Sequence, residues 1–351
     1  MNSFGSILIG ICLLSFNSIC IGQTKDSIQN TDQIDTNYIT TFPDHIVGRA
    51  YLSRKYTNMV IDNKDGNENL TYDPNTSLNF GLGITVNHFT LNLAYGFRFL
   101  NQDGEKKGET RHLDLQSHIY KRKFVIDLFG QFYNGLFLND SNLNPVSSNE
   151  TFYLRPDISI QLVGITALKV KNYKKFSYAA PFLQNELQHK SAGSFLYGVS
   201  ASAFFSQSDS NYVPSFITDS IYRSNFDVKQ MQAIQIGPNV GYAYSLIIGK
   251  RFFATASLNI AFLIGPIKYT TFDNEERKEW QVNGNLSARV GFGYNSPKWY
   301  LGITALQDGT RLRTLDETSE IGIGAGNFRI NYVKRFLMGP KLKKQVDKLP
   351  I

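Results

Sequence analysis

Apolar side chains alternate with small or polar ones over long stretches of this chain. In the clearest stretch, residues 78 to 99, apolar residues occupy every second position on both sides of Asn87 and His88. Each half has about ten residues, close to the length that a tilted β-strand needs to cross a bilayer. A turn at Asn87 and His88 would pair Val86 with Phe89 and keep the apolar faces together. The pattern therefore predicts a β-hairpin with one lipid-facing and one lumen-facing side.

The same alternation recurs across residues 230–270 and 279–308, with short turns at 249–251 and 295–298. A soluble antiparallel sandwich would also alternate, but its strands usually have about five or six residues. Short turns alternate here with longer polar loops, as in membrane barrels. We therefore predict an all-β fold, an antiparallel transmembrane β-barrel of about 12 strands, within a range of about 10 to 14. The predicted strands cover residues 46–62, 77–86, 89–100, 110–120, 124–137, 157–171, 194–207, 230–248, 252–270, 279–294, 299–308 and 319–336.

Two segments depart from this scheme. Phe176 to Lys190 is apolar enough for a strand, but an extra crossing there would exchange the short and long connections on either side. We therefore predict a helix or a strap for this segment, inside the barrel. In the last strand the apolar face changes between Ala325 and Phe328. That change predicts a β-bulge near Gly326–Asn327.

The N-terminus carries a long apolar run, Phe4 to Ile21, followed by a polar stretch. Such a run is typical of a secretory signal peptide with a short helix, although its length also permits a retained anchor helix. We predict a signal peptide at 1–22 with cleavage near Gly22, an N-terminal periplasmic segment at 23–44, an outer-membrane barrel at 45–336 and a basic periplasmic tail at 337–351. Because Cys12 and Cys20 both lie in the signal segment, the exported chain would have no disulfide or thiolate metal site.

The charge distribution points to lipid and away from nucleic acid. The net charge of +7, from 36 Lys and Arg against 29 Asp and Glu, is spread over turns and loops rather than gathered on one element beside stacking aromatics. Basic residues at turns suit a position near anionic headgroups. We expect outer-membrane lipid as a partner, no nucleic acid and no cofactor, and the sequence contains no phosphate-binding glycine loop, zinc spacing or calcium loop.

The sharpest chemical candidate pairs a histidine with a carboxylate. On the predicted strand 110–120 the polar residues share one face, which we expect to point into the lumen; they are His112, Asp114, Gln116, His118 and Tyr120. A turn at Arg122–Lys123 would place His118 directly opposite Asp127. A histidine oriented by a carboxylate is half of a nucleophile-activating site or a second-shell metal arrangement. Such pairs also arise as simple cross-strand contacts, and no serine is assigned by the sequence as a partner.

Two further groups are weaker candidates. His189 and Ser191 lie in the predicted strap beside Gln184, Glu186, Gln188 and Ser194, and a membrane lipase or deacylase uses Ser and His with an orienting group. Four arginines, Arg49, Arg98, Arg289 and Arg329, would form an anion-attracting ring if they project into the lumen. The alternative is that they pair with Asp114 or Asp127 as a structural plug. The polar residues that we expect to face the lumen are Arg98, His112, Asp114, His118, Asp127 and Arg289.

Several short phrases of the sequence occur together in one known family. They are YLSRKY at 51–56, LNLAYG at 91–96, FGQFY at 129–133, SAGSFL at 191–196 and FRINY at 328–332. With these phrases the chain resembles, over residues 36 to 336, a family of outer-membrane barrel proteins of Bacteroidota that is catalogued as a domain of unknown function (DUF 4421). The resemblance implies a barrel fold and an outer-membrane location. It brings no known activity and no site residue.

The sequence favours a non-enzymatic outer-membrane barrel that serves as a narrow or plugged pore, a transport protein or a structural component of the envelope. One alternative is an integral lipid hydrolase that acts through His118 and Asp127, or through His189 and a nearby serine. Another is an accessory subunit of a secretion or envelope machine with protein partners, suggested by the basic tail. These hypotheses about function differ in whether they require the lumen to be open or filled.

Overall fold

The structure, a computed structural model, describes residues 33–62, 69–86, 89–97, 106–139, 152–314 and 319–346. The predicted signal peptide and the end of the tail lie outside these ranges. Within them the chain is mostly β-strand, and none of the helices has the length and apolarity that a bilayer crossing requires.

The alternating segments of the sequence form long strands, joined by short turns at one end, the turn end, and by longer loops at the other, the loop end. The strands are β1 Ile39–Thr41, β2 His45–Asp62, β3 Leu70–Asp73, β4 Leu78–Val86, β5 Phe89–Tyr95, β6 Arg111–Tyr120, β7 Phe124–Leu138, β8 Tyr153–Val170, β9 Glu186–Gln188, β10 Ala192–Gln207, β11 Val228–Ile248, β12 Phe252–Thr271, β13 Glu276–Asn295, β14 Trp299–Arg313 and β15 Glu320–Leu337. The helices are α1 Ala179–Phe182, α2 Ser220–Asn225 and α3 Pro340–Val346.

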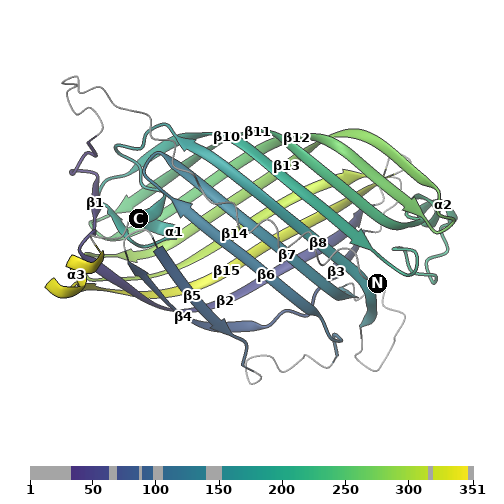
Figure 1. Ribbon diagram of the computed structural model, residues 1–351, viewed down its shortest axis with the longest axis horizontal. Coiled ribbons are helices and arrows are strands. Elements are labelled where there is room, and N and C mark those ends of the chain that lie inside the picture. Colours follow the sequence, from purple (N-terminus) through teal and green to yellow (C-terminus); the bar gives the residue numbers. More distant parts are fainter. Residues whose placement is uncertain are drawn as a thin grey trace. The chain divides into compact units, whose positions relative to one another are not determined.

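Ten strands close a ring by antiparallel pairing (Figure 1). Around the ring they follow the order β2, β3, β7, β8, β10, β11, β12, β13, β14 and β15, and β15 returns to β2 along its whole length. β4 and β5 extend from β2, and β6 pairs with β7. The predicted antiparallel barrel is therefore confirmed, and the short strands β1, β3 and β9 are additions to the predicted set.

The registers expected from the short turns are also present. Val86 pairs with Phe89, on either side of residues 87–88, which lie outside the described ranges. Ile248 pairs with Phe252 across the turn at 249–251. Because a slip of one residue would exchange the two faces of a strand, these registers keep every apolar outer face continuous with its neighbour.

The predicted bulge in the last strand is wrong. β15 pairs with β2 and β14 in unbroken register through Gly326 and Asn327. The apolar face changes because the environment changes. Ile321 and Ile323 face inward into an apolar cluster at the loop end, whereas Phe328 and Ile330 face outward nearer the turn end.

The segment 171–191 folds inward and fills the turn end of the lumen, as the prediction of a helix or strap required. This plug segment contains α1 and β9, and β9 pairs with β1 rather than with the ring. Phe176, Tyr178 and Ala179 are buried in one cluster with inward side chains of the wall such as Leu168. We use the name plug segment for residues 171–191 throughout.

The loop end is filled by the connection between β10 and β11, residues 208–227. Asp219 caps α2 by accepting hydrogen bonds from the backbone N–H groups of its first turn. Tyr212 and Tyr222 from this connection are fully buried among inward residues of the ring. The Tyr72 hydroxyl donates to the Tyr212 carbonyl at 2.6 Å, and the Tyr222 hydroxyl donates to the Ile61 carbonyl at 3.2 Å.

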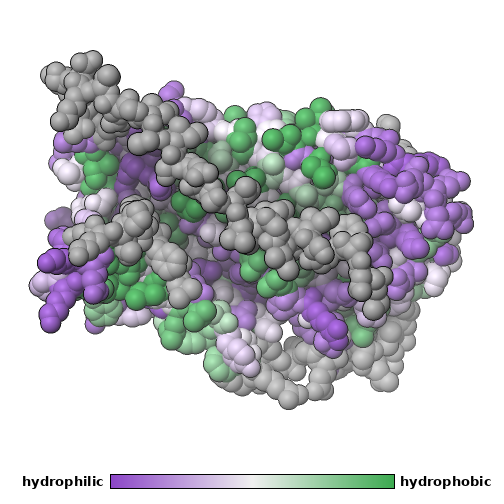
Figure 2. Space-filling model, in the orientation of Figure 1, coloured by the Kyte–Doolittle hydropathy of each residue, from purple (hydrophilic) through white to green (hydrophobic). Residues whose placement is uncertain are grey.

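The outer face carries a continuous apolar band. On β12 the outward residues from Phe252 to Ile264 are all apolar, while each second residue between them is buried. At about 3.3 Å per residue and a tilt of about 40°, this band spans about 30 Å along the barrel axis. Figure 2 shows apolar side chains over the middle of the face and polar ones gathered at the end that carries α2.

Candidate functional site

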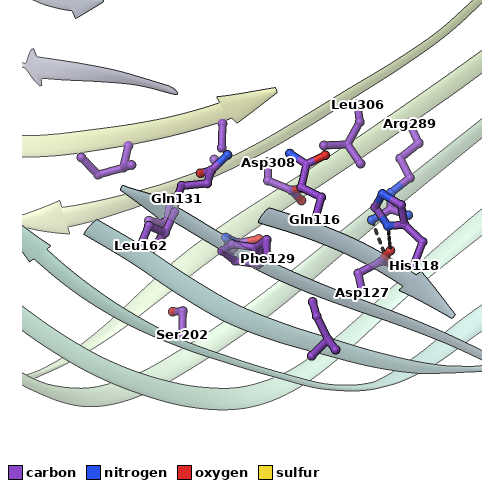
Figure 3. Close-up of a pocket in the computed structure, with 16 residues that line it drawn as sticks. Gln116, His118, Asp127, Phe129, Gln131, Leu162, Ser202, Arg289, Leu306 and Asp308 are labelled. Carbon is purple, nitrogen blue, oxygen red and sulfur yellow. Dashed lines mark hydrogen bonds and ion pairs between the residues drawn. The ribbon is translucent and has the colours of Figure 1, made fainter. Parts of the chain in front are cut away.

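Asp127 is the centre of a polar cluster in the middle of the lumen. On the same strand, Val125 belongs to the cluster with the plug segment and Phe129 packs against the apolar cluster at the loop end. The Asp127 carboxylate accepts hydrogen bonds from His118 Nδ1 at 2.6 Å and from the Tyr120 hydroxyl at 2.8 Å. Figure 3 shows His118 and Arg289 converging on this carboxylate.

Arg289 supplies the opposite charge. Its Nη2 donates to Asp127 Oδ2 at 2.7 Å, and its other terminal nitrogen donates to the Tyr120 hydroxyl. Its guanidinium lies 5.9 Å from the ring centroids of Tyr120 and Tyr178. A buried charge is tolerated when it is paired and its remaining donors and acceptors are occupied. Asp127 and Arg289 therefore form an internal ion pair, in which the Arg289 Nε is buried without a hydrogen-bond partner.

A small cavity of about 40 Å³ lies beside the cluster. His118 lines it, with 28% of its side chain exposed. Polar groups from several strands also line it, and they are Gln116, Gln131, Ser202, Asn285, Asp308 and Thr310. In the described ranges, no serine or threonine hydroxyl forms a hydrogen bond with His118. The geometry therefore contains an oriented histidine beside room for a few water molecules, without a nucleophile bonded to the histidine.

Asp114 makes a second polar cluster, which connects β6 to β2. Lys55 Nζ of β2 donates to its carboxylate at 2.9 Å, and the Tyr133 hydroxyl donates at 3.1 Å. Asn327 of β15 donates to Gln116 at 3.3 Å. His112, on the same row of β6, is exposed and stacks on the Tyr133 ring.

The strap residues are used to hold the plug segment. His189 Nε2 hydrogen-bonds the Thr40 hydroxyl at 2.7 Å, and the backbone N–H of His189 donates to the Tyr38 carbonyl at 2.7 Å. Burial lowers the pKa of His189, and the nearby charge of Arg251 lowers it further. The Ser191 hydroxyl accepts from the Ile247 backbone N–H. The structure therefore gives His189 and Ser191 separate partners.

The other predicted strap residues also have structural contacts. Glu186 accepts hydrogen bonds from Arg122 and from the Ser177 hydroxyl. Gln188 donates to the Lys175 carbonyl, and Ser194 accepts from the Asn172 backbone N–H. These contacts fasten the plug segment to the turn end.

The four predicted arginines have different surroundings. Arg98 lies outside the described ranges, and Arg289 pairs with Asp127. Arg49 Nη2 donates to the Thr85 hydroxyl at 3.0 Å and to the Leu183 carbonyl at 2.9 Å. Arg329 lies over the Tyr51 ring, 4.6 Å from its centroid. Within the described part of the chain, neither Arg49 nor Arg329 forms an ion pair with a carboxylate.

Sequence reasoning missed three of the residues that hold these clusters. Lys55 reaches Asp114 across 59 positions of sequence, and Arg335 donates to the Gln184 carbonyl and to Asn295. Tyr120 stood on the predicted polar face, but nothing indicated that it would bind Asp127. No group of three or more His, Cys, Asp or Glu residues suited to a metal ion occurs among the described residues.

Several solved barrels resemble the structure at low sequence identity. The outer-membrane protease OmpT of Escherichia coli aligns at a TM-score of 0.37 and 12% identity, over 85% of this chain and 98% of that one. The Pseudomonas putida toluene transporter TodX aligns at 0.29 and 9%, over 85% and 92%. OmpT of Vibrio cholerae aligns at 0.28 and 9%, over 85% and 100%.

No curated protein sequence matches this chain. A family model does, and its match runs from residue 33 to residue 336, which takes in β1 and nearly the whole barrel. The chain therefore belongs to the family described as domain of unknown function DUF4421.

Proposed function

We propose that this protein is an outer-membrane β-barrel that works with a closed lumen, as a ligand-binding or structural component of the envelope and not as an open diffusion pore. The observation that carries the proposal is the filling of the lumen at both ends. The plug segment occupies the turn end, and Tyr212 and Tyr222 occupy the loop end. A solute cannot cross a lumen of this kind without moving one of these segments.

The apolar band supports the membrane location. Its height of about 30 Å equals the thickness of a typical hydrocarbon core. Trp280 is 70% exposed at the loop-end edge of the band, and the next outward residue on β13, Lys278, is charged. At the other edge Tyr294 stacks on Trp299 with 4.4 Å between ring centroids. Aromatic residues favour both interfaces of a bilayer.

The orientation follows from the connections. Short turns face the periplasm and longer loops face outward in barrels of this type. The plug segment, β1 and α3 lie at the turn end, where Lys343 of α3 pairs with Asp44 at 2.8 Å. The proposal therefore assigns the plug segment and the basic tail to the periplasmic side, close to outer-membrane lipid.

Single-channel recording on the purified protein in planar bilayers tests the closed lumen. We expect no steady porin-like conductance from the native chain. A variant in which residues 177–187 and residues 209–226 both become glycine–serine linkers of equal length should conduct, because both ends of the lumen would be emptied. Changing Lys341, Lys343 and Lys344 of α3 to serine is the control, since these side chains lie outside the lumen. Large, steady conductance from the native protein would refute the proposal.

The His118–Asp127 pair supports a second candidate function, that of a lipid hydrolase. Its hydrogen bond of 2.6 Å lies beside a cavity that Ser202 and Thr310 also line. A fluorescent phosphonate that reacts with activated serine or threonine tests this candidate on the purified protein. Labelling that is lost in His118→Ala would favour a hydrolase, and absence of labelling in the native chain would count heavily against it.

A role as an accessory subunit of a secretion or envelope machine, and the Bacteroidota source that the resemblance implies, stay predictions. The exposed lysines of α3 at the turn end are the surface that would meet a partner. Purification from detergent-solubilised outer membrane without a stable protein partner would speak against the accessory role.

A further inference from the structure

In the described part of the barrel wall, two successive strands lack backbone pairing with each other. Among the described residues, β5 pairs with β4 and β6 pairs with β7, but no backbone pairing joins β5 to β6. At the loop end this opening is bounded, because β3 pairs directly with β7 and Asn75 donates to Thr110 and to the Gly108 carbonyl. The opening therefore runs along the wall toward the turn end.

The inner face of β5 is uncovered beside this opening. The pairing register places Asn92 in one inward row with Arg49, and Ala94 in one inward row with Tyr51. Arg49 and Tyr51 are buried, yet Asn92 and Ala94 are exposed. On β12, by contrast, every inward residue is buried. Each row of inward residues runs across three paired strands, from Asn92 or Ala94 on β5 to Arg49 or Tyr51 on β2. These rows therefore lead from the opening toward Arg49 and Tyr51.

The edge at β6 is held in place without β5. Lys55 and Asn327 reach it from β2 and β15 through their contacts with Asp114 and Gln116. They are side-chain contacts, and within the described ranges the outer backbone edge of β6 has no strand partner. The opening is thus built into the arrangement of the strands.

Arg49 and Arg329 carry positive charge at the inner end of these rows. Arg49 is 5% exposed, and the Nε atoms of both arginines are buried without a hydrogen-bond partner. The Arg329 guanidinium lies over the ring of Tyr51, and Arg49 stands two residues before Tyr51 on the same inward face of β2, so the two positive charges are neighbours and repel each other. Of the buried carboxylates in the lumen, Asp114 pairs with Lys55 and Asp127 with Arg289, and Asp308 lies by Ser287 and Arg289 rather than by Arg49 or Arg329. Buried like charges without a counter-charge are costly, so this site favours an anion.

We propose that the opening between β5 and β6 admits the phosphate-bearing headgroup of a membrane lipid, which Arg329 and Arg49 bind. The planar guanidinium group suits the oxygens of a phosphate. The acyl chains stay outside, against exposed residues such as Leu93 and Leu115. Because both ends of the lumen are filled, the anion comes from the lipid side rather than from water. The inference rests on the proposed membrane location.

The first experiment measures binding of short-chain phosphatidylglycerol to the purified protein in neutral detergent, by isothermal titration calorimetry. Arg329→Met should weaken binding by about tenfold or more, because a charge-assisted hydrogen bond contributes on that order. Arg329→Lys should lose less, since it keeps the charge. Lys334→Met is the matched control, since Lys334 lies on the same strand but faces outward, and it should bind like the native chain. Native-like binding by Arg329→Met would overturn the site.

The second experiment tests the path. Ala94→Cys, alkylated with a bulky maleimide after folding, should lose lipid binding because the adduct fills the inner face of β5. Leu93→Cys, alkylated in the same way, should bind normally because its side chain faces outward. Outside Cys12 and Cys20 the chain has no cysteine, so the label is specific once residues 1–22 are removed. Equal binding by both adducts would overturn entry between β5 and β6.

A third experiment, competition with inorganic phosphate, distinguishes binding of a lipid headgroup from binding of free phosphate. Inorganic phosphate at millimolar concentration should not displace the lipid, and displacement would overturn the assignment to a lipid headgroup. The binding arms do not depend on conductance. An open channel would therefore refute the proposed closed lumen while leaving the lipid site to be judged on its own result.

Discussion

The buried charge of Asp127 is satisfied by other side chains. Asp127 has three donors, from His118, Tyr120 and Arg289, and both members of its ion pair are less than a tenth exposed. In such surroundings the loss of one partner leaves the other charge buried and unpaired, which costs far more than the loss of a surface pair.

Arg289→Met should therefore lower the free energy of unfolding by about 3 to 5 kcal/mol. Lys268→Met is the comparison, because Lys268 and Glu276 form an exposed pair and its loss should cost at most about 1 kcal/mol. Urea titrations in detergent, followed by the gel mobility of the folded form, measure both values. Equal small losses would mean that Asp127 is not held by Arg289.

Glycine is required where an aromatic ring lies across a neighbouring strand. A side chain at Gly81 would collide with the ring of Tyr51, which itself supports Arg329. At Gly284 of β13 nothing lies within 4 Å of the position that a Cβ would take. The two glycines therefore differ in what alanine would meet.

We expect Gly81→Ala to cost about 1 to 3 kcal/mol through displacement of Tyr51. Gly284→Ala should be neutral or stabilising by up to about 1 kcal/mol, because glycine in a strand loses more conformational freedom on folding. The same urea titration distinguishes them. A loss at Gly284 as large as that at Gly81 would show that strand glycines serve some general purpose other than accommodating Tyr51.

How much of the candidate site could be predicted depends on distance along the chain. His118 and Asp127 were placed opposite each other because a two-residue turn determines the register on both sides of it. Lys55 and Arg335 could not be assigned to Asp114 and Gln184, since Lys55 and Asp114 lie on strands far apart in sequence and Gln184 lies in the plug segment. Local periodicity tells which face a residue occupies, but it does not tell what lies across the lumen.

At the scale of elements, the strands whose outer face is apolar along most of their length were the most predictable. β12 alternates without interruption, and its bounds differ from the predicted 252–270 by one residue. The bulge predicted in β15 was wrong because the inner face of this strand becomes apolar near Ile321, where the lumen has an apolar core. Alternation shows only that the two faces of a strand differ in polarity. Where the lumen is apolar, it does not show which face is the outer one. The four-residue β3 is too short to leave a periodic signal.

The contact between β1 and β9 should weaken in acid. His189 has a lowered pKa in the folded protein, relative to about 6.5 in an unfolded chain. The unfolded form therefore binds the proton more readily, so the contribution of neutral His189 is present above about pH 6.5 and is lost as the pH falls below it. Acid should loosen the contacts of His189 with Thr40 and Tyr38.

Hydrogen–deuterium exchange of peptides that cover residues 36–42 measures this loosening. After correction for intrinsic rates, we expect faster exchange at pH 5.5 than at pH 7.5 in the native chain. His189→Gln keeps a polar side chain without titrating, so its exchange should not change over this interval. A pH dependence that persists in His189→Gln would assign the effect to another group.

At the scale of the whole molecule, the lumen is layered along its axis. An apolar core fills the loop end, a polar layer with Asp127 and Asp114 occupies the middle, and the plug segment fills the turn end. The outer face has its own pattern, an apolar band with polar surface beyond Trp280. A layered lumen and an apolar outer band are expected of a barrel that contacts lipid around its middle and water at its ends.

This arrangement makes a depth-dependent prediction on a single strand. Leu258 and Ile264 of β12 both face outward and are about half exposed, at 51% and 47%, but Leu258 lies at the middle of the apolar band and Ile264 at its edge. In a bilayer, arginine at the middle of a barrel costs about 2 to 4 kcal/mol and arginine near an interface about 0 to 1 kcal/mol. In water, arginine at either exposed position would change stability by no more than about 0.5 kcal/mol. Urea unfolding of Leu258→Arg and Ile264→Arg in liposomes therefore separates the two environments. Equal, small effects at both positions would exclude the membrane location, because only lipid makes the middle of the band different from its edge.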